Sequence, residues 1–276
     1  MTQLAAAIRL DLAETLRSRW LWACTTVYAA LALIFVVLGM RESSVLGYTG
    51  TGRALLSFTH ALVLVLPLLA LAATTQTVSR ARDDGSFELL FSQPLSRGTW
   101  FASVALVRYA ALVAPLVALV LVAAVAGEVA FGQPVPWDYL GQCLAVCASL
   151  ALAFVGIGLA ISTFVRSPAR ATLMLVLVWA LAVALLDFGL IGAMLRWGLA
   201  PRAVFAIAAL NPVEGARLAL LAGIEPDLAT LGPVGFYLAN YLGPRALFAA
   251  GVAWPAALGV LSLAAALARF RRSDVV

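Results

Sequence analysis

Apolar residues occupy most of the chain in long runs, and short polar stretches separate these runs. A helix needs about 20 apolar residues to cross a bilayer core about 30 Å thick, and windows of that length fit six times along the sequence. We therefore predict an all-α membrane protein with six transmembrane helices, forming a single membrane domain over residues 1–276. The predicted spans cover about residues 20–40, 55–77, 101–126, 140–165, 172–195 and 246–267.

Residues 1–19 follow a different pattern, in which leucine or isoleucine recurs at every fourth position. Leu4, Ile8, Leu12 and Leu16 fall on one side of a helix, and the charged residues lie elsewhere around it. This pattern predicts an amphipathic helix in the membrane interface that leads into the first span. A frayed cytosolic tail is the alternative interpretation.

Composition agrees with a membrane protein, because 64% of the 276 residues are hydrophobic and 11% are charged. In soluble domains, roughly 45–50% of residues are hydrophobic and about 25% are charged. The net charge is +5, but the arginines flank apolar runs and form no aromatic-interleaved patch, so we expect no nucleic-acid partner. The sequence contains neither lysine nor a P-loop motif. If ATP drives this protein, a separate chain must hydrolyse it.

The arginines also predict the orientation of the spans. Short segments on the side of both termini carry eleven arginines, whereas the opposite short loops carry only Arg41 and Arg53. Because cytoplasmic loops are enriched in basic residues, we expect both termini in the cytoplasm. Arg108, about two turns inside the third span, is expected to reach back to that interface.

The polar stretch Ser79–Gly98 then lies in the cytoplasm between the second and third spans. Asp83 or Asp84 can cap a helix, Gly85 loosens the chain before it, and Pro94 prevents its continuation. These signals predict a helix of about two turns.

The apolar residues of this short helix, Phe87, Leu90 and Phe91, share one face, and Glu88 lies near its N-terminal end. Isolated helices need roughly 12–15 residues to be even marginally stable in water, so this face needs a surface to dock on. The lipid interface and a cytosolic partner are both available. The mixed charges around the apolar residues favour a groove on a partner protein.

The segment "DDGSFELLFSQPLSR" resembles the first cytoplasmic loop of ABC-2-type permeases. The resemblance extends to the N-terminal helix, the six spans and the long loop before the last span. It implies a type V ABC exporter-like fold, a dimer of the membrane subunit, and a short coupling helix that docks on a separate ATPase, which binds the ATP and magnesium. The implied coupling segment comprises Asp83, Asp84, Gly85, Ser86, Phe87, Glu88, Leu90, Phe91, Pro94 and Arg97.

Within this family, the stretches "LGYTGTGRALLSFTHALVLVLPLLAL", "LLDFGLI" and "ALNPVEGARLALLAGIE" are similar to the permease subunits that support maturation of nitrous oxide reductase. That resemblance implies a bacterial inner-membrane protein with a role in copper-site assembly and a periplasmic subunit on its outer surface. Asn211, Pro212, Glu214 and Arg217 are the implied outer contacts.

Ionisable residues within the spans raise rival interpretations. Asp187 lies deep in the fifth span, where a charge costs at least about 2.5–3.5 kcal/mol on insertion scales. It is either a structural partner to another polar group or part of a transport or coupling path. His60 is either a packing residue or a lone ligand. An intramembrane enzyme or ion-coupled carrier built on Asp187 and His60 is therefore one alternative function, and a general exporter permease for a drug, lipid or glycan is another.

Cys143 and Cys147 lie on one helix face, and Met174 follows in the next span. Soft sulfur ligands suit Cu(I), but membrane helices also use cysteine as a small core residue. We expect no catalytic site, metal site or bound cofactor in this chain.

Overall fold

The computed structural model describes residues 3–34, 48–131, 134–185, 210–224 and 243–272. These residues form helices joined by short connections, with no strand among them. The helices are α1 (Gln3–Arg17), α2 (Arg19–Ile34), α4 (Tyr48–Thr74), α5 (Thr77–Asp83), α6 (Ser86–Phe91), α7 (Arg97–Phe131), α8 (Trp137–Phe164), α9 (Pro168–Ala180) with the π-helical turn η2 (Leu181–Leu185), α12 (Pro212–Ile224) and α14 (Gly243–Arg272).

Four helical segments are long and apolar enough to cross a membrane, namely Phe58–Asp83, Arg97–Val129, Trp137–Phe164 and Gly243–Arg272. They contain the third and sixth predicted spans in full and nearly all of the second and fourth. The first and fifth predicted spans begin in the shorter apolar helices Arg19–Ile34 and Pro168–Val183. The remainder of those two spans, 35–40 and 186–195, lies outside the described residues, so the count of six stays a prediction.

Helix α8 lies at the centre of the bundle and packs against α4, α7, α12 and α14. Glycines allow α8 and α14 to approach closely. A Cβ atom on Gly156 would lie 2.4 Å from the carbonyl oxygen of Gly259, and one on Gly259 would lie 2.6 Å from that of Leu152. Small residues at such crossings let backbones pack without intervening side chains, as in other membrane helix pairs.

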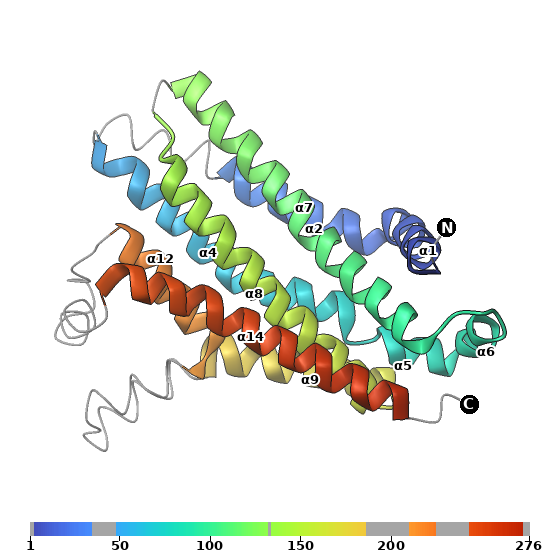
Figure 1. Ribbon diagram of the computed structural model, residues 1–276. Coiled ribbons are helices and arrows are strands. Elements are labelled where there is room, and N and C mark those ends of the chain that lie inside the picture. Colours follow the sequence, from blue (N-terminus) through green and yellow to red (C-terminus); the bar gives the residue numbers. More distant parts are fainter. Residues whose placement is uncertain (1–2, 35–47, 132–133, 186–209, 225–242, 273–276) are drawn as a thin grey trace, which may run out of the picture.

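The two ends of the bundle differ in what they carry. The start of α1, the short helix α6 and the end of α14 lie at one end, whereas α12 lies at the other (Figure 1). This arrangement places the described ends of the chain on the same side as the 79–98 stretch. The cytoplasmic identity of that side remains a prediction from the arginines.

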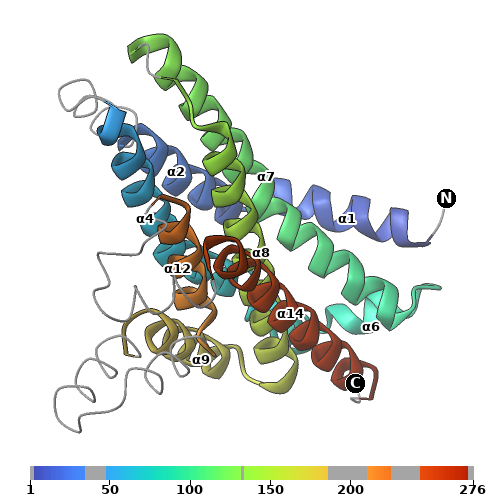
Figure 2. The ribbon, with the colours of Figure 1, turned by 60° about the vertical axis from the view of Figure 1, so that its left-hand side comes forward.

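Helix α1 confirms that residues 3–17 are helical, and it packs along α7 (Figure 2). The predicted apolar side faces outward, because Leu4, Leu12 and Leu16 are exposed. The other side contacts the bundle through Ala7 and Thr15, which are buried. An exposed leucine side is what a helix lying in the membrane interface requires.

Candidate functional site

The predicted two-turn helix forms α6, and a left-handed glycine separates it from α5. Gly85 adopts φ +74°, a conformation that costs glycine little and other residues much. The Asp84 carboxylate accepts the backbone N–H of Ser86 at 3.0 Å and also accepts the Ser86 hydroxyl. These hydrogen bonds lower the pKa of Asp84. Of the two predicted capping residues, Asp84 therefore stabilises the start of α6, and Asp83 ends α5.

Helix α5 is attached to the centre of the bundle at its own N-terminus. The Ser162 hydroxyl of α8 accepts the backbone N–H of Val78 at 2.7 Å and that of Ser79 at 3.3 Å. The first N–H groups of a helix have no partner within the helix, so a side chain from another helix fills the capping role here. Gly158 makes room for this junction, because a Cβ on it would overlap Thr74.

The apolar face of α6 packs inside the chain. Phe87 is 2% exposed, and its ring lies 5.0 Å from that of Trp100 on α7 and 5.6 Å from that of Phe270 on α14. The Phe91 ring also contacts Trp100 and Phe270, and the Phe101 ring lies 5.8 Å from that of Phe270 in a tilted arrangement. We call Phe87, Phe91, Trp100, Phe101 and Phe270 the aromatic cluster.

This packing corrects the prediction for Phe87, which is covered by the chain itself and not by a separate protein; the predicted docking of Leu90 and Phe91 stays a prediction. Helices α7 and α14 supply the surface that the two-turn helix needs. Burying a phenylalanine side chain against them stabilises this packing by about 1.5–3 kcal/mol. Phe87 is inaccessible, and Leu90 and Phe91 pack partly buried beside it. The sequence could not indicate this, because Phe270 lies at the far end of the chain.

The outer face of α6 consists of Glu88, Leu89 and Ser92, all of which are exposed. Leu89 is 75% exposed, a high value for leucine. The sequence pattern did not single out Leu89, because this residue belongs to no apolar repeat. The signal was present: a leucine one position from the buried face of a capped helix must point away from that face.

The segment after α6 fixes its position relative to α7. Pro94 is exposed, and the guanidinium carbon of Arg97 lies 5.9 Å from the centre of the Phe91 ring, a distance typical of a cation–π contact. The Ser96 hydroxyl accepts the backbone N–H of Thr99 at 3.1 Å and so caps α7. The predicted residues from Asp83 to Arg97 therefore form one continuous structural unit.

The predicted outer contacts divide into two buried residues and one ion pair. Asn211 is 3% exposed; its amide donates to the Ala182 carbonyl of η2 at 2.7 Å, and its oxygen accepts the Val213 N–H at 3.1 Å. Pro212 is also buried. These two residues seat α12 inside the bundle, so the expectation that they contact a partner is wrong. Glu214 and Arg217 are half-buried and form an ion pair at 2.7 Å.

The rival sites gain little from the structure. Asp187 lies outside the described residues, and His60 is a half-buried residue of α4. Cys143 and Cys147 are buried free thiols, whereas Met174 is exposed. Among the described residues, no group of three or more histidine, cysteine or acidic side chains is arranged to hold a metal ion.

Comparison with known proteins covers nearly the whole chain. The family model described as "ABC-2 family transporter protein" matches residues 5–275. A "Probable ABC transporter permease protein NosY" of Pseudomonas aeruginosa is 28% identical over 284 residues, with 97% of each chain covered. The protein of the same name from Stutzerimonas stutzeri is 26% identical over 279 residues, with 99% of each chain covered.

Proposed function

This chain belongs to the ABC-2 transporter family, whose members are membrane permease subunits, and from that premise we propose that a separate ATPase drives it through α5 and α6. The observation that carries the proposal is the division of α6 into two faces. Leu89 on the outer face is exposed for contact, while Phe87 on the inner face is packed against two long helices. ATP and magnesium would bind to the ATPase.

A displacement of α6 would move α7 and α14 together. The Phe87 ring contacts Trp100 and Phe270, so α6 cannot shift without repacking both contacts. Packed aromatic interiors resist compression and transmit strain. The Ser162 contact to α5 adds α8 to the same unit. Closure of two ATPase subunits would thus reach three long helices of each permease copy.

We propose further that two copies assemble in the bacterial inner membrane, with both termini in the cytoplasm. The arginine distribution supports the orientation. Exposed apolar residues on α7, α9 and α14, such as Val122, Leu177 and Leu261, are suited to contact lipid or a second copy. The dimer is an expectation from the family, and mass photometry of the purified complex would test it.

The more specific proposal is a role in copper-site maturation of nitrous oxide reductase, together with a periplasmic subunit. Its support is the shared name of the two relatives and their coverage of the full chain. The test is complementation of a denitrifying strain that lacks its own NosY, measured as the copper content of purified nitrous oxide reductase. Restored copper supports this role; an apo-enzyme despite normal membrane levels of the chain leaves the general exporter permease as the better assignment.

ATPase docking is tested by co-purification of the tagged chain from native membranes. We expect a P-loop ATPase in equal amount, and we expect Leu89→Asp to abolish its recovery while the chain itself stays folded. Leu210→Asp is the matched control, because Leu210 is 66% exposed and lies just before α12, away from α5 and α6 in the chain. Activity without any ATPase would instead favour the intramembrane enzyme or ion-coupled carrier.

A further inference from the structure

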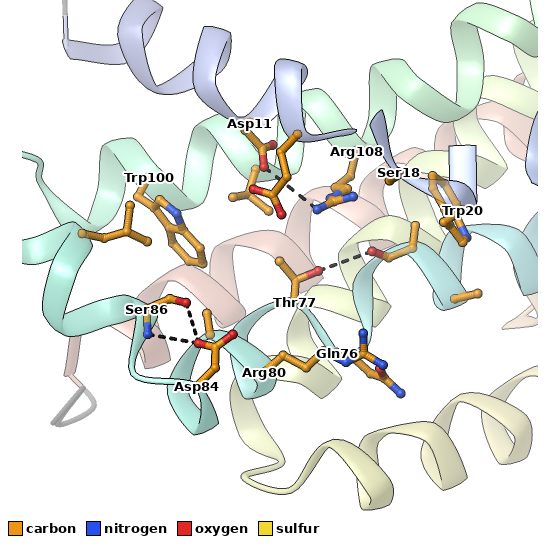
Figure 3. Close-up of a pocket in the computed structure, with 16 residues that line it drawn as sticks. Asp11, Ser18, Trp20, Gln76, Thr77, Arg80, Asp84, Ser86, Trp100 and Arg108 are labelled. Atoms are coloured by element: carbon orange, nitrogen blue, oxygen red, sulfur yellow. Dashed lines mark hydrogen bonds and ion pairs between the residues drawn. The ribbon is translucent and has the colours of Figure 1, made fainter. Parts of the chain in front are cut away.

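A cavity of about 590 Å³ lies between the interfacial helix α1 and the helices that carry α6 (Figure 3). Its walls come from α1 and the start of α2, from the junction of α4 and α5, from α6, and from the first turns of α7. This volume falls within the range of sites that hold small molecules, about 300–1,000 Å³. The role proposed for α6 does not use this cavity.

Both signs of charge line the cavity. Asp11 and Arg108 lie on one side of it, and Asp84 and Arg80 lie across from them, as Figure 3 shows. Glu14 adds a third carboxylate. The closest oppositely charged pair is Arg108 and Asp11, whose Nη2 and Oδ1 atoms are 4.0 Å apart. The predicted reach of Arg108 to the interface thus ends at an acidic residue of α1.

Three residues that line this cavity each carry a buried polar atom without a hydrogen-bond partner among the described residues. These atoms are the Trp20 Nε1–H, the Arg108 Nε–H and the Asp11 Oδ2 atom. An unmade hydrogen bond at a buried polar atom is costly, so three beside one cavity indicate side chains that gain a partner by turning toward a bound ligand. The set comprises two donors and one anionic acceptor. Burial also raises the pKa of Asp11, and Arg108 only partly offsets this.

Two features of the helices around the cavity are typical of the headgroup layer of a membrane. The leucines of α1 face outward, as expected for a helix in the interface. Trp20 and Trp100, which both line the cavity, stand near the starts of α2 and α7. Tryptophan is enriched at this depth of a membrane. A molecule in this cavity is therefore presented to the level of lipid phosphates and amines.

We propose that this cavity binds a zwitterionic ammonium–phosphate headgroup of the phosphoethanolamine type. The phosphate oxygens would accept the Trp20 and Arg108 N–H groups, and the ammonium would donate to Asp11 Oδ2. A purely anionic ligand would face three carboxylates, and a purely cationic one would leave both donors unmet. The phosphoethanolamine headgroup matches the donors and the acceptor together.

The experiment is native mass spectrometry of the detergent-solubilised full chain with phosphatidylethanolamine or phosphatidylglycerol of identical acyl chains. We expect phosphatidylethanolamine to bind about tenfold more tightly. Asp11→Asn should remove this preference, because it removes the charge that the ammonium requires. Trp20→Phe should weaken both lipids by a similar factor, because it removes a donor to the phosphate that both lipids share.

Matched controls are Glu128→Gln and Arg170→Gln, which neutralise exposed residues that do not line the cavity. Neither should change lipid binding. Trp20→Phe keeps most of the ring volume, so it remains informative even where Asp11→Asn lowers the thermal midpoint.

A water-soluble competitor distinguishes the two sources of the headgroup. Displacement of the lipid by millimolar glycerophosphoethanolamine would assign the site to the headgroup in free or lipid form. Retention of the lipid against this competitor would assign it to the intact phospholipid. Equal binding of both lipids to the unmodified chain, or an unchanged preference in Asp11→Asn, would overturn the proposal.

Discussion

Helix α6 and helix α12 are both short, both begin at a turn-forming sequence, and lie at opposite ends of the bundle (Figure 1). Helix α6 buries one face against α7 and α14 and exposes the other. Helix α12 is packed against α4, α8 and α14, and most of its apolar residues are buried. Helix α6 is therefore a surface element that is packed on one face, whereas α12 is part of the core.

The two helices differ in burial because they contact their neighbours in different ways. Helix α12 sits directly on α14, because a Cβ on Gly251 would lie 2.6 Å from the Gly215 carbonyl oxygen and 2.4 Å from the Ala219 Cβ. Helix α6 instead contacts its neighbours through large aromatic rings. Backbone contact leaves no room for a partner protein, whereas ring contact on one side leaves the other side free. Of these two helices, α6 is the one that presents an exposed face to a partner.

The largest expected effect comes from removing the buried side chain that packs α6 against α7 and α14. Phe87→Ala should lower the free energy of unfolding by about 3–5 kcal/mol, because it empties the centre of the aromatic cluster. Leu89→Ala, on the exposed face of the same helix, should change it by less than about 0.5 kcal/mol. Denaturant unfolding in detergent measures both. Similar losses in the two variants would contradict the division of α6 into a buried and an exposed face.

A smaller effect is expected where α12 meets α14. Gly251→Ala should destabilise the protein by about 1–3 kcal/mol, since the added methyl group meets backbone that must shift. Gly141→Ala on α8 is the matched control, because a Cβ there meets nothing within 4 Å. It should be neutral or stabilising by up to about 1 kcal/mol, the helix preference of alanine over glycine. A thermal midpoint that falls in Gly251→Ala and does not fall in Gly141→Ala would establish the close packing of α12 on α14.

Asn211→Ala tests the attachment of α12 at its N-terminus. It removes the acceptor for the Val213 N–H and leaves the Ala182 carbonyl without its amide donor. A loss of about 1–2 kcal/mol is expected, as for other helix caps with a buried partner. Glu214→Gln alters a partly exposed ion pair and should cost about 0–1 kcal/mol. An Asn211→Ala protein as stable as the Glu214→Gln protein would show that the buried amide carries no stability.

The smallest effect concerns pH at the start of α6. Hydrogen bonds from Ser86 lower the pKa of Asp84, so the folded state favours the carboxylate more than the unfolded state does. The stability from this group is therefore present above the unfolded pKa of about 3.9 and is lost as pH falls through the lowered folded value. Amide hydrogen exchange in α6 should accelerate toward acidic pH, after correction for the intrinsic rate. In Asp84→Asn this dependence should be absent.

Four of the six predicted spans are matched by long apolar helices. They were predictable because hydropathy over about 20 residues depends only on neighbouring positions. The bounds of α6 were predictable for the same reason, since Asp84, Gly85 and Pro94 act locally. The buried face of α6 was identified, but what covers it was not. Trp100 and Phe270 belong to other helices, and no local pattern indicates that they meet Phe87.

Buried polar residues account for the remaining errors. Asn211-Pro212 has the sequence of an exposed turn, yet its amide is used to join α12 to η2 inside the protein. Asp11 and Arg108 are nearly a hundred positions apart, and their proximity follows from α1 folding back on α7. Partners far apart in sequence leave no periodic signal, so only the assembled bundle indicates which polar residue is covered.

Site-specific photo-crosslinking in native membranes tests most directly whether the outer face of α6 receives the ATPase. A benzophenone amino acid replaces Leu89 of α6 in one variant and Leu210, just before α12, in the other, and both leucines are exposed. Our account predicts a crosslink from position 89 to a P-loop ATPase and none from position 210. A position-89 variant that is folded and present in the membrane, yet forms no crosslink to an ATPase that co-purifies with it, would contradict the account.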